Sequence, residues 1–332
     1  MKKIKINHLD LFSGIGGFHL GFEKAGFEVN SYFSEVDKYA IDVYKNNFKN
    51  SNYVGSVTDV RGTQLPKIDA ITFGSPCQDF SLAGKRKGMG GQRSSLITEA
   101  IRLIDECRPR FFVWENVKGT FSSNNGEDFW AIMQAFTNIG GYRLEWQLLN
   151  TKWFLPQNRE RIYLVGYIAE GSRGQIFPIS KSNKWNNEKT NKFTSTCITT
   201  SYHKGVNFDN QLIEVKSATK KGFEVATSAD ERIMTTEIGD FRSDEGYRKR
   251  KDGNCPTLPA RARNDISGML IVNKIRRLTP IECERLQGFP DNWTQYGESG
   301  QISDTQRYKM CGNAVTVDVV EAVAKNIIKT IY

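Results

Sequence analysis

Cys77 is the side chain of this sequence best suited to act as a nucleophile. It lies in the segment GSPCQDFS at 74–81, directly after an apolar run that ends at Phe73. The thiolate is the reactive form, and a free cysteine with a pKa of about 8.5 is only slightly ionised at neutral pH. A neighbouring cation that lowers this pKa by about one unit would contribute about 1.4 kcal/mol. Residues 84–93 contain four glycines and four basic residues, a composition that predicts a loop able to move and to contact phosphates.

A second segment, DLFSGIGG at 10–17, could hold a nucleotide-like cofactor. It joins a β-rich run to a helical pattern, where glycines permit a tight turn and let backbone N–H groups approach a ligand. Glu35 follows about 20 residues later, at the predicted end of the next strand, where an acid can accept hydrogen bonds from ribose hydroxyls. The spacing is not GxGxxG, so these features predict an adenosine-containing cofactor without separating NAD from S-adenosylmethionine.

These residues need a scaffold that brings them together. Residues 1–168 alternate β-rich runs with helical patterns, which predicts βαβ units and a doubly wound, parallel sheet. Ligands of such sheets bind beyond the carboxyl ends of the strands, so we expect the turn at 10–17 and Cys77 to face one crevice. The predicted strands are Ile4–Phe12, Glu28–Ser34, Ile68–Phe73, Phe111–Glu115, Leu144–Asn150 and Arg161–Ile168.

The helical patterns carry start and stop signals. Gly26 follows Gly17–Ala25 as a predicted C-cap, and Asp37 is suited to cap Lys38–Phe48. Helical periodicity also occurs at Leu96–Cys107 and Val315–Ile328.

The positive charge is concentrated in one stretch. The 332 residues include 46 Lys and Arg against 37 Asp and Glu, a formal net charge of +9. Residues 171–275 hold 18 basic and 12 acidic residues, which leaves 28 against 25 for the rest of the chain. This stretch predicts a smaller, mostly β or irregular domain that binds a polyanion. We therefore predict one domain from 1–168 plus 276–332 and a second from 169–275.

Several classes of protein are excluded by the composition. The 39% hydrophobic and 11% aromatic content excludes wholesale disorder. No apolar run reaches the length of about 18 residues that predicts a membrane span, and the basic N-terminus lacks the apolar region of a secretory signal. The six cysteines form no CxxC pair and the three histidines are scattered. We therefore expect reduced thiols and no metal site.

Six motifs in a fixed order resemble those of the DNA (cytosine-5)-methyltransferase family. They cover residues 8–168 and 276–328, on either side of a variable stretch where that family has its target-recognition domain. The motifs are DLFSGIGG at 10–17, GSPCQDFS at 74–81, ENV at 115–117, QNRERIY at 157–163, RLTPIECERLQGFP at 277–290 and GNAV at 312–315. The resemblance implies a Rossmann-like, S-adenosylmethionine-dependent methyltransferase fold.

The resemblance also implies a chemistry. The Cys77 thiolate would add to carbon 6 of a cytosine flipped out of duplex DNA, making carbon 5 nucleophilic enough to take a methyl group. Glu115 would protonate or hydrogen-bond ring nitrogen 3. Arg161 and Arg159 would hold the base and a neighbouring phosphate and stabilise developing charge. No metal is required.

For the cofactor, the resemblance implies Phe12 against the adenine or sulfonium side, Glu35 on the ribose and Asn313 nearby. Two positions depart from the family pattern. Val36 occupies the position where a tryptophan commonly stacks on adenine, and Ser56 replaces an aspartate that usually contacts its amino group, with Asp59 three residues later as a substitute. The full predicted set is Phe12, Ser13, Gly14, Gly16, Gly17, Glu35, Val36, Ser56, Val57, Pro76, Asn313 and Ala314.

For DNA, the resemblance implies contacts from the basic loop after Cys77 and from a Thr-Leu element at 257–258 near the flipped base. The predicted set is Ser81, Lys85, Arg86, Lys87, Arg93, Thr257, Leu258 and Arg261. The basic run at 248–251 is as consistent with a solvated surface as with a DNA contact.

The expected protein is thus a cytoplasmic, nucleoid-associated monomer that modifies double-stranded DNA beside a cognate restriction endonuclease. A transfer-RNA cytosine-5 methyltransferase uses the same scaffold and is the nearest alternative. The glycine-rich turn and Glu35 alone would also permit an NAD-dependent dehydrogenase. A catalytically inactive DNA-binding regulator is the third possibility, although all the chemical residues are present.

Overall fold

The computed structural model describes residues 3–75, 96–180 and 275–332, together with the strand segments 212–214, 237–242, 246–249 and 266–270. The chain forms two compact units. The first comprises Met1–Leu149, Glu160–Ser180 and Val319–Tyr332, and the second comprises Asn150–Arg159 and Lys181–Asp318.

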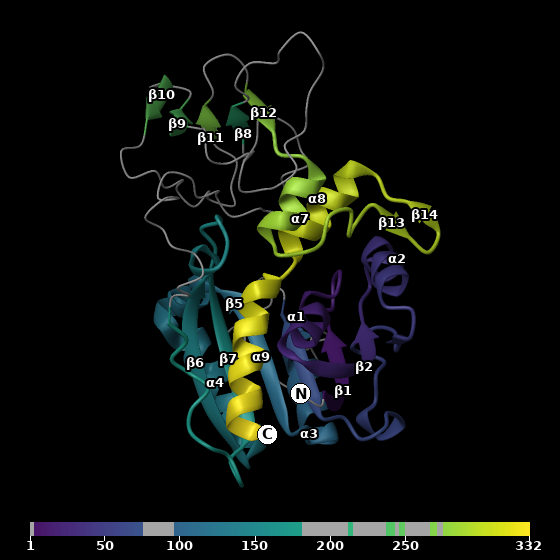
Figure 1. Ribbon diagram of the computed structural model, residues 1–332. Helices are drawn as coiled ribbons and strands as arrows, with labels where there is room; N and C mark the ends of the chain where they lie inside the picture. The colour runs from purple at the N-terminus through teal and green to yellow at the C-terminus, as the bar shows by residue number, and fades with distance from the viewer. Residues whose placement is uncertain are drawn as a thin grey trace, which may run out of the picture. The chain divides into compact units, whose positions relative to one another are not determined.

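A seven-stranded sheet forms the centre of the first unit (Figure 1). Its strand order is β3-β2-β1-β4-β5-β7-β6. The strands are β1 (Ile4–Leu11), β2 (Phe27–Ser34), β3 (Asn52–Tyr53), β4 (Ala70–Gly74), β5 (Phe111–Val117), β6 (Tyr142–Asn150) and β7 (Glu160–Ile168). Neighbouring strands from β3 to β5 pair in parallel, whereas β7 runs antiparallel to β5. The doubly wound α/β prediction is confirmed, but the prediction of a wholly parallel sheet is wrong at β7.

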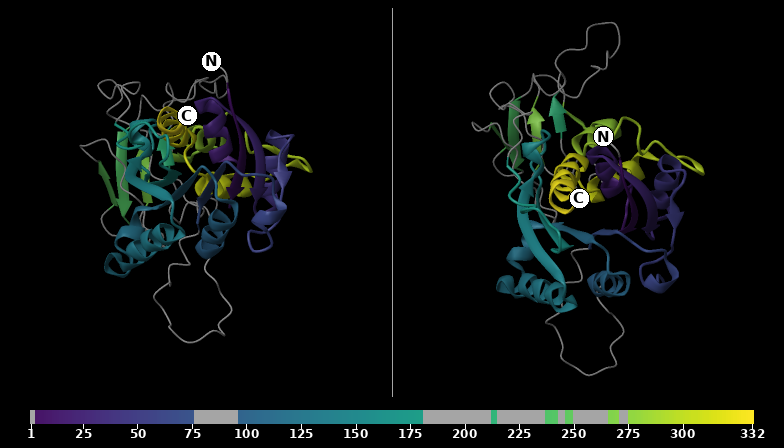
Figure 2. Two further views of the ribbon diagram at one scale, coloured as in Figure 1. Left: turned by 90° about the horizontal axis from the view of Figure 1, so that it is seen from below. Right: turned by 60° about the horizontal axis from the view of Figure 1, so that its bottom comes forward.

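Helices cover both faces of this sheet, as Figure 2 shows. One face carries α1 (Gly17–Ala25), α2 (Lys38–Asn47) and α9 (Val317–Ile331), and the other carries α3 (Leu96–Cys107) and α4 (Glu127–Ile139). The alternation of side chains along a strand assigns residues to these faces. Leu9 and Leu11 join the core beneath α3 and α4, so His8 and Asp10 point to the opposite face.

Aromatic side chains fill the core on the α3 and α4 face. Phe112 and Trp114 of β5 contact Phe136 of α4, and all three are fully buried. Full burial of one such side chain contributes about 1.5–3 kcal/mol. Gly166 of β7 makes this packing possible, because a Cβ there would lie 2.2 Å from the Phe112 ring.

The helix signals in the sequence mostly agree with the structure. Gly26 adopts φ 115° and its N–H caps the end of α1, while the Asp37 carboxylate accepts from the Tyr39 N–H at the start of α2. The helix α4 was not predicted. It begins after Gly126, which has φ 89° and offers no capping side chain, so the usual sequence signal of a helix start is missing.

The described residues of the second unit form short strands and two helices. β9 (Glu237–Arg242) pairs antiparallel with β10 (Gly246–Lys249) and β11 (Ile266–Leu270), and β12 (Ile275–Arg277) pairs with β8 (Leu212–Glu214). The remaining elements are α7 (Pro280–Leu286), α8 (Asp304–Asn313), β13 (Tyr296–Gly297), β14 (Gly300–Gln301) and the 3-10 turn η5 (Thr151–Trp153). The assignment of 169–275 to target recognition stays a prediction.

The described part of the first unit also has three 3-10 turns and a returning C-terminal helix. The turns are η1 (Gly62–Gln64), η3 (Lys118–Phe121) and η4 (Ser123–Gly126). The last turns of α9 are fixed by Asn326, whose amide donates to the Ile176 carbonyl at 2.8 Å. Beyond the helix, the Tyr332 ring packs against Phe27, and the Arg110 guanidinium lies 4.2 Å above it.

The direction of the strands determines which residues share an edge. The carboxyl ends of β1, β2, β4 and β5 lie at one edge because these strands are parallel. The antiparallel β7 begins at that same edge, with Val117 opposite Arg161. Those predicted site residues of the first unit that the structure describes are found near this edge.

Candidate active site

The glycine-rich loop after β1 adopts the left-handed conformations that its sequence predicts. Phe12, Gly14 and Gly16 have φ of 52°, 54° and 85°, and α1 begins at Gly17. The Ser13 N–H donates to the Ser34 carbonyl at 3.1 Å, which ties this loop to the end of β2. The Ser13 hydroxyl is buried and has no hydrogen-bond partner among the described residues, so it is available to a bound molecule.

Two glycines of this loop form a matched pair for mutagenesis. We expect Gly16→Ala to lower the free energy of unfolding by about 2–5 kcal/mol, because its Cβ would lie 2.3 Å from the buried Phe48 ring in addition to being strained at positive φ. Gly14→Ala should cost only the conformational part, about 1–2 kcal/mol, since no atom lies within 4 Å of its Cβ. Urea unfolding of the cofactor-free protein measures both. Equal losses in the two variants would contradict the packing of Phe48 against the loop.

Glu35 supports the loop in a way that the sequence did not reveal. Its Oε2 accepts from the Gly14 N–H at 2.8 Å, and its Oε1 accepts from the N–H groups of Val36 and Asp37 at 2.7 and 3.0 Å. The carboxylate therefore connects the end of β2 with the glycine-rich loop and with the start of α2. Its contact with a ribose remains a prediction.

The two departures from the family pattern, Val36 and Ser56, follow shortly after β2 and β3. The Val36 side chain is 75% exposed. The Tyr53 hydroxyl donates to the Glu35 carbonyl at 3.0 Å. After β3, the Ser56 hydroxyl lies 2.9 Å from the Thr58 hydroxyl, which donates in turn to Asp59 at 3.3 Å, while Val57 is buried. The proposed substitution of Asp59 for the missing aspartate stays a prediction.

Two buried polar side chains of β1, His8 and Asp10, form a polar row with Thr72 of β4 beneath the glycine-rich loop. The Asp10 Oδ1 accepts from the Thr72 hydroxyl at 2.8 Å, and the His8 Nε2 lies 2.7 Å from the same hydroxyl. Burial raises the pKa of Asp10 well above its usual value, opposed by the Thr72 hydrogen bond, and burial lowers the pKa of His8. Both shifts favour uncharged forms in the core. The polar alternation of His8 and Asp10 in an apolar strand was the only sequence signal of this row.

Ser75 anchors the start of the segment that contains Cys77. The Ser75 hydroxyl accepts from the Trp114 Nε1 at 3.1 Å and from the Asn116 Nδ2 at 3.0 Å, and the same amide donates to the Ser75 carbonyl at 3.2 Å. The Asn116 Oδ1 accepts from the Val117 N–H and the Thr120 hydroxyl. The asparagine of the ENV motif therefore connects the ends of β4 and β5.

Many predicted site residues lie outside the described residues. They are Pro76, Cys77, Ser81, Lys85, Arg86, Lys87, Arg93, Thr257, Leu258 and Arg261. Their roles as nucleophile, cofactor contact and DNA contacts stay predictions.

Glu115 and Arg161 meet at the common edge of the sheet. The Arg161 Nε lies 3.1 Å from the Glu115 Oε1, and their side chains are 17% and 11% exposed. Beyond this ion pair, Oε1 makes no hydrogen bond with the described residues. Gly74 leaves room for the carboxylate, because a Cβ there would lie 3.2 Å from Oε2. The arrangement provides a partly buried carboxyl group beside a guanidinium. This carboxyl group is able to hydrogen-bond a heterocyclic ring.

Arg159 is held within the second unit. Its guanidinium is buried and donates to the carbonyls of Gly312 and Ala314, at 3.3 and 2.9 Å. It thereby fixes the backbone on both sides of Asn313, a predicted cofactor contact. These bonds give Arg159 a positioning role, and its assignment as a catalytic residue stays a prediction.

Glutamines support the same region of the second unit. The Gln157 amide donates to the Leu286 carbonyl at 2.7 Å, and the Gln287 amide donates to the Cys311 carbonyl at 2.9 Å. The hydroxyl of Thr316 donates to Gln287 Oε1 at 3.0 Å and lies 2.8 Å from that of Thr151. Three motifs far apart in the sequence are therefore joined by buried hydrogen bonds.

The described cysteines are unsuited to nucleophilic attack. Cys107, Cys283 and Cys311 are free thiols. Burial raises the pKa of Cys107 to about 11 and raises the pKa of the other two as well. A reactive cysteine requires a lowered pKa. The thiols in the described part of the chain are therefore poor candidates for the nucleophile.

Within the described residues, no group of three or more His, Cys, Asp or Glu side chains is arranged to hold a metal ion. The helices in this part of the chain are also too short or too polar to cross a membrane.

Known proteins resemble this chain over nearly its whole length. The family model for C-5 cytosine-specific DNA methylase matches residues 6–329. The chain is 32% identical to the Type II methyltransferase M.Bsp6I of Bacillus sp. (strain RFL6), over 96% of this chain and 98% of that protein. It is 31% identical to the Type II methyltransferase M.HaeII of Haemophilus aegyptius, over 100% of this chain and 95% of that protein. The solved structure of the Entamoeba histolytica methyltransferase EhMeth has a TM-score of 0.62 at 18% identity, over 99% of this chain and 98% of that one, which is a likeness of fold.

Proposed function

The chain belongs to the C-5 cytosine-specific DNA methylase family, and on this basis we propose that it transfers a methyl group from S-adenosylmethionine to carbon 5 of a cytosine flipped out of duplex DNA, through a covalent adduct with Cys77. The enzyme is a DNA (cytosine-5) methyltransferase. This assignment excludes the dehydrogenase and the inactive regulator that the sequence alone permitted.

The pair of Glu115 and Arg161 is the observation that carries the mechanism. A cytosine ring presents nitrogen 3 and an exocyclic amino group along one edge, and a carboxyl group can hydrogen-bond both. The Glu115 Oε1 has the ion pair with Arg161 but no hydrogen bond within the described residues, so it retains capacity for such a ring. Arg161 offsets the cost of burying the carboxylate when no base is bound.

The proposed reaction begins at Cys77. Its thiolate forms a bond from Sγ to carbon 6, and the electron pair displaced from the ring is stabilised at nitrogen 3 by a proton or hydrogen bond from Glu115. Carbon 5, now enamine-like, would take the methyl group as the methyl–sulfur bond of S-adenosylmethionine breaks and its electron pair stays on sulfur, leaving S-adenosylhomocysteine. A base removes the carbon-5 proton, and the electron pair of that bond expels Sγ from carbon 6. A proton given to nitrogen 3 returns to Glu115, and the aromatic ring is restored.

The residues around the glycine-rich loop fit an adenosine-containing cofactor. The buried, unpaired hydroxyl of Ser13 and the exposed apolar surface of Val36 are both features that a bound molecule would satisfy. The Glu35 Oε2 accepts one backbone N–H and keeps a lone-pair site for a ribose hydroxyl, whereas Oε1 already accepts two. S-adenosylmethionine, when bound, supplies an electrophilic methyl group. Phe12, Glu35, Val36, Ser56 and Val57 are the residues of the first unit proposed to hold it.

The DNA substrate is supported by charge and by relatives. Extrusion of a base from the duplex costs a few kcal/mol, which the basic residues after Cys77 and the excess charge of 171–275 would offset through phosphate contacts. The relatives M.Bsp6I and M.HaeII are named Type II methyltransferases. We therefore infer that this enzyme protects DNA against a cognate restriction endonuclease, acting as a monomer in the cytoplasm at the nucleoid.

The proposed function is tested by methyl transfer from S-[methyl-³H]adenosylmethionine to duplex DNA and, in parallel, to unmodified transfer RNA. We expect labelling of DNA at a rate at least about 100-fold above that of transfer RNA, with all label recovered as 5-methylcytosine by chromatography of the digested product. Preferential labelling of transfer RNA would overturn the DNA substrate. Recovery of the label in any other nucleoside would overturn the proposed mechanism.

A further inference from the structure

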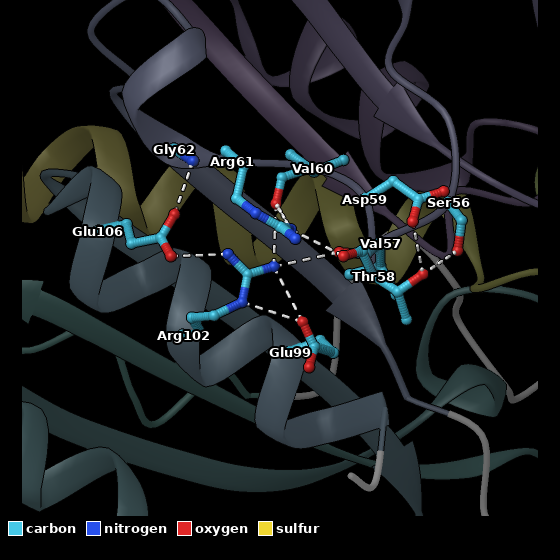
Figure 3. A network of polar contacts seen from close by, with 10 residues as sticks. All are labelled: Ser56, Val57, Thr58, Asp59, Val60, Arg61, Gly62, Glu99, Arg102 and Glu106. Atoms are coloured by element: carbon cyan, nitrogen blue, oxygen red, sulfur yellow. Dashed lines mark hydrogen bonds and ion pairs between the residues drawn. The ribbon is translucent and has the colours of Figure 1, made fainter. Parts of the chain in front are cut away.

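The segment from Ser56 to Gly62 is held by charged side chains of α3, as Figure 3 shows. The Arg102 Nη2 donates to the carbonyls of Val57 and Val60, at 3.3 and 2.9 Å. The Glu106 Oε2 accepts from the Gly62 N–H at 2.7 Å. These bonds join positions 40 or more residues apart in the sequence, so they fix the segment from outside.

The Arg102 guanidinium is itself fixed at both ends. Its Nε donates to Glu99 at 2.9 Å and its Nη1 donates to Glu106 at 2.7 Å. Glu99 lies about one turn of α3 before Arg102, and Glu106 about one turn after it. The hydrogen bonds of Arg102 and of the Gly62 N–H hold the pKa of Glu106 below its usual value, although partial burial opposes this shift. The bridge therefore persists at neutral pH with both side chains charged.

The held segment cannot easily adopt another backbone path. The Ser56 carbonyl accepts from the N–H groups of Asp59 and Val60, at 2.9 and 3.2 Å. Arg61 donates to the carbonyls of Thr58 and Val60, at 2.7 and 3.0 Å. At Gly62 a Cβ would lie 2.7 Å from that of Glu106. The segment thus packs directly against α3, and Val57 and Val60 are part of the core there.

This support matters because Ser56 of this segment and Val36 after β2 offer little to a nucleobase through their side chains. Ser56 has a shorter reach than the aspartate that the family places there, and Val36 lacks the flat surface of a tryptophan. Affinity for adenine then depends on accurate placement of the backbone of Ser56 and Val57. A displacement of about 1 Å at such a site costs much of the binding energy.

We propose that Arg102 and Glu106 are positioning residues for the cofactor, which hold Ser56 and Val57 in the conformation that binds adenosine. The proposal rests on the proposed use of S-adenosylmethionine. Neither side chain needs to touch the cofactor, because Arg102 acts through the carbonyl groups of Val57 and Val60.

Arg108 provides a matched control. It follows the same helix, pairs with Asp105 at 2.7 Å and donates to the carbonyls of Ile139 and Gly140, at 2.9 and 3.1 Å. It therefore makes the same kinds of bond as Arg102 but to a different part of the unit. The variant Arg108→Met should lose comparable interactions without moving Ser56 or Val57.

The test compares the wild type, Arg102→Lys, Glu106→Gln and Arg108→Met. Calorimetry gives the Kd for S-adenosylhomocysteine without DNA, and steady-state kinetics give KM for S-adenosylmethionine, KM for DNA and kcat. A lysine keeps the charge of Arg102 but cannot reach two carboxylates and two carbonyls at once. We expect Arg102→Lys to raise the Kd and the cofactor KM about tenfold and Glu106→Gln about threefold, with kcat and the DNA KM within twofold of wild type.

The outcomes separate this proposal from the proposed function. Arg108→Met should leave the Kd within twofold even if it lowers Tm as much as Arg102→Lys does. Equal changes of Kd in Arg102→Lys and Arg108→Met, or none in Arg102→Lys, would overturn the positioning role while leaving the methyltransferase intact. A wild type that binds no S-adenosylhomocysteine would overturn both. If Arg102→Lys does not fold, an unchanged Kd in Glu106→Gln overturns the positioning role.

Discussion

Replacement of Cys77 by serine is expected to reduce methyl transfer by about a thousandfold or more, while binding of DNA and S-adenosylhomocysteine stays near the wild-type level. A serine hydroxyl is far less acidic than a thiol, so the attacking anion is almost absent at neutral pH. Single-turnover transfer of labelled methyl measures the loss, and fluorescence anisotropy of labelled duplex measures binding. Substantial residual turnover in the serine variant would contradict the covalent route.

A trapping experiment tests the same bond directly. In a duplex with 5-fluorocytosine at the target position, carbon 5 carries no proton to remove, so elimination of Sγ is blocked after methyl transfer. We expect a complex that survives denaturing electrophoresis with the wild type and none with Cys77→Ser. Absence of the complex, in an enzyme that methylates normal DNA, would contradict the mechanism.

Glu115→Gln is expected to lower kcat about 10²–10⁴-fold, because the amide cannot supply the proton that stabilises charge at nitrogen 3. Cofactor binding should change little, since the described partner of the carboxylate is Arg161. Single-turnover rates separate the chemical step from DNA binding.

Glu160→Gln is the matched control for this prediction. Glu160 lies at the same edge of the sheet and pairs with Lys118 at 2.9 Å, but its side chain is 37% exposed. Removal of its charge should leave kcat within about threefold, as expected for an exposed ion pair. Similar losses of kcat in the two variants would indicate that the local charge balance sets the rate, rather than proton transfer by Glu115.

The sequence predicted the elements that carry local signals. Gly26 and Asp37 act as the caps that their residue types indicate, and the strand ending in Glu115 is present with two further residues. The direction of β7 could not be predicted, because the side-chain pattern of a strand is the same in either direction. That direction brings Arg161 to Glu115.

The features that the sequence could not predict are hydrogen bonds between segments far apart in the chain. Three sets of hydrogen bonds join residues far apart in the chain. They support Ser75 from Trp114 and Asn116, link Arg102 to Val57 and Val60, and link Arg159 to Gly312 and Ala314. No periodicity or spacing specifies such partners. From the ENV motif the sequence predicted a role for Glu115 alone, and the structure shows that Asn116 holds Ser75, in the segment that leads to Cys77.

The return of α9 to the first unit has a consequence for synthesis on the ribosome. The strands of the sheet are complete once residue 168 has been made, yet the unit also contains Val319–Tyr332. At about 5–20 residues per second, the intervening residues take roughly 8–30 s to emerge. During that time Tyr332 does not yet cover the Phe27 ring. We therefore expect the nascent chain to be a substrate for chaperones, and to reach protease resistance only once α9 has emerged.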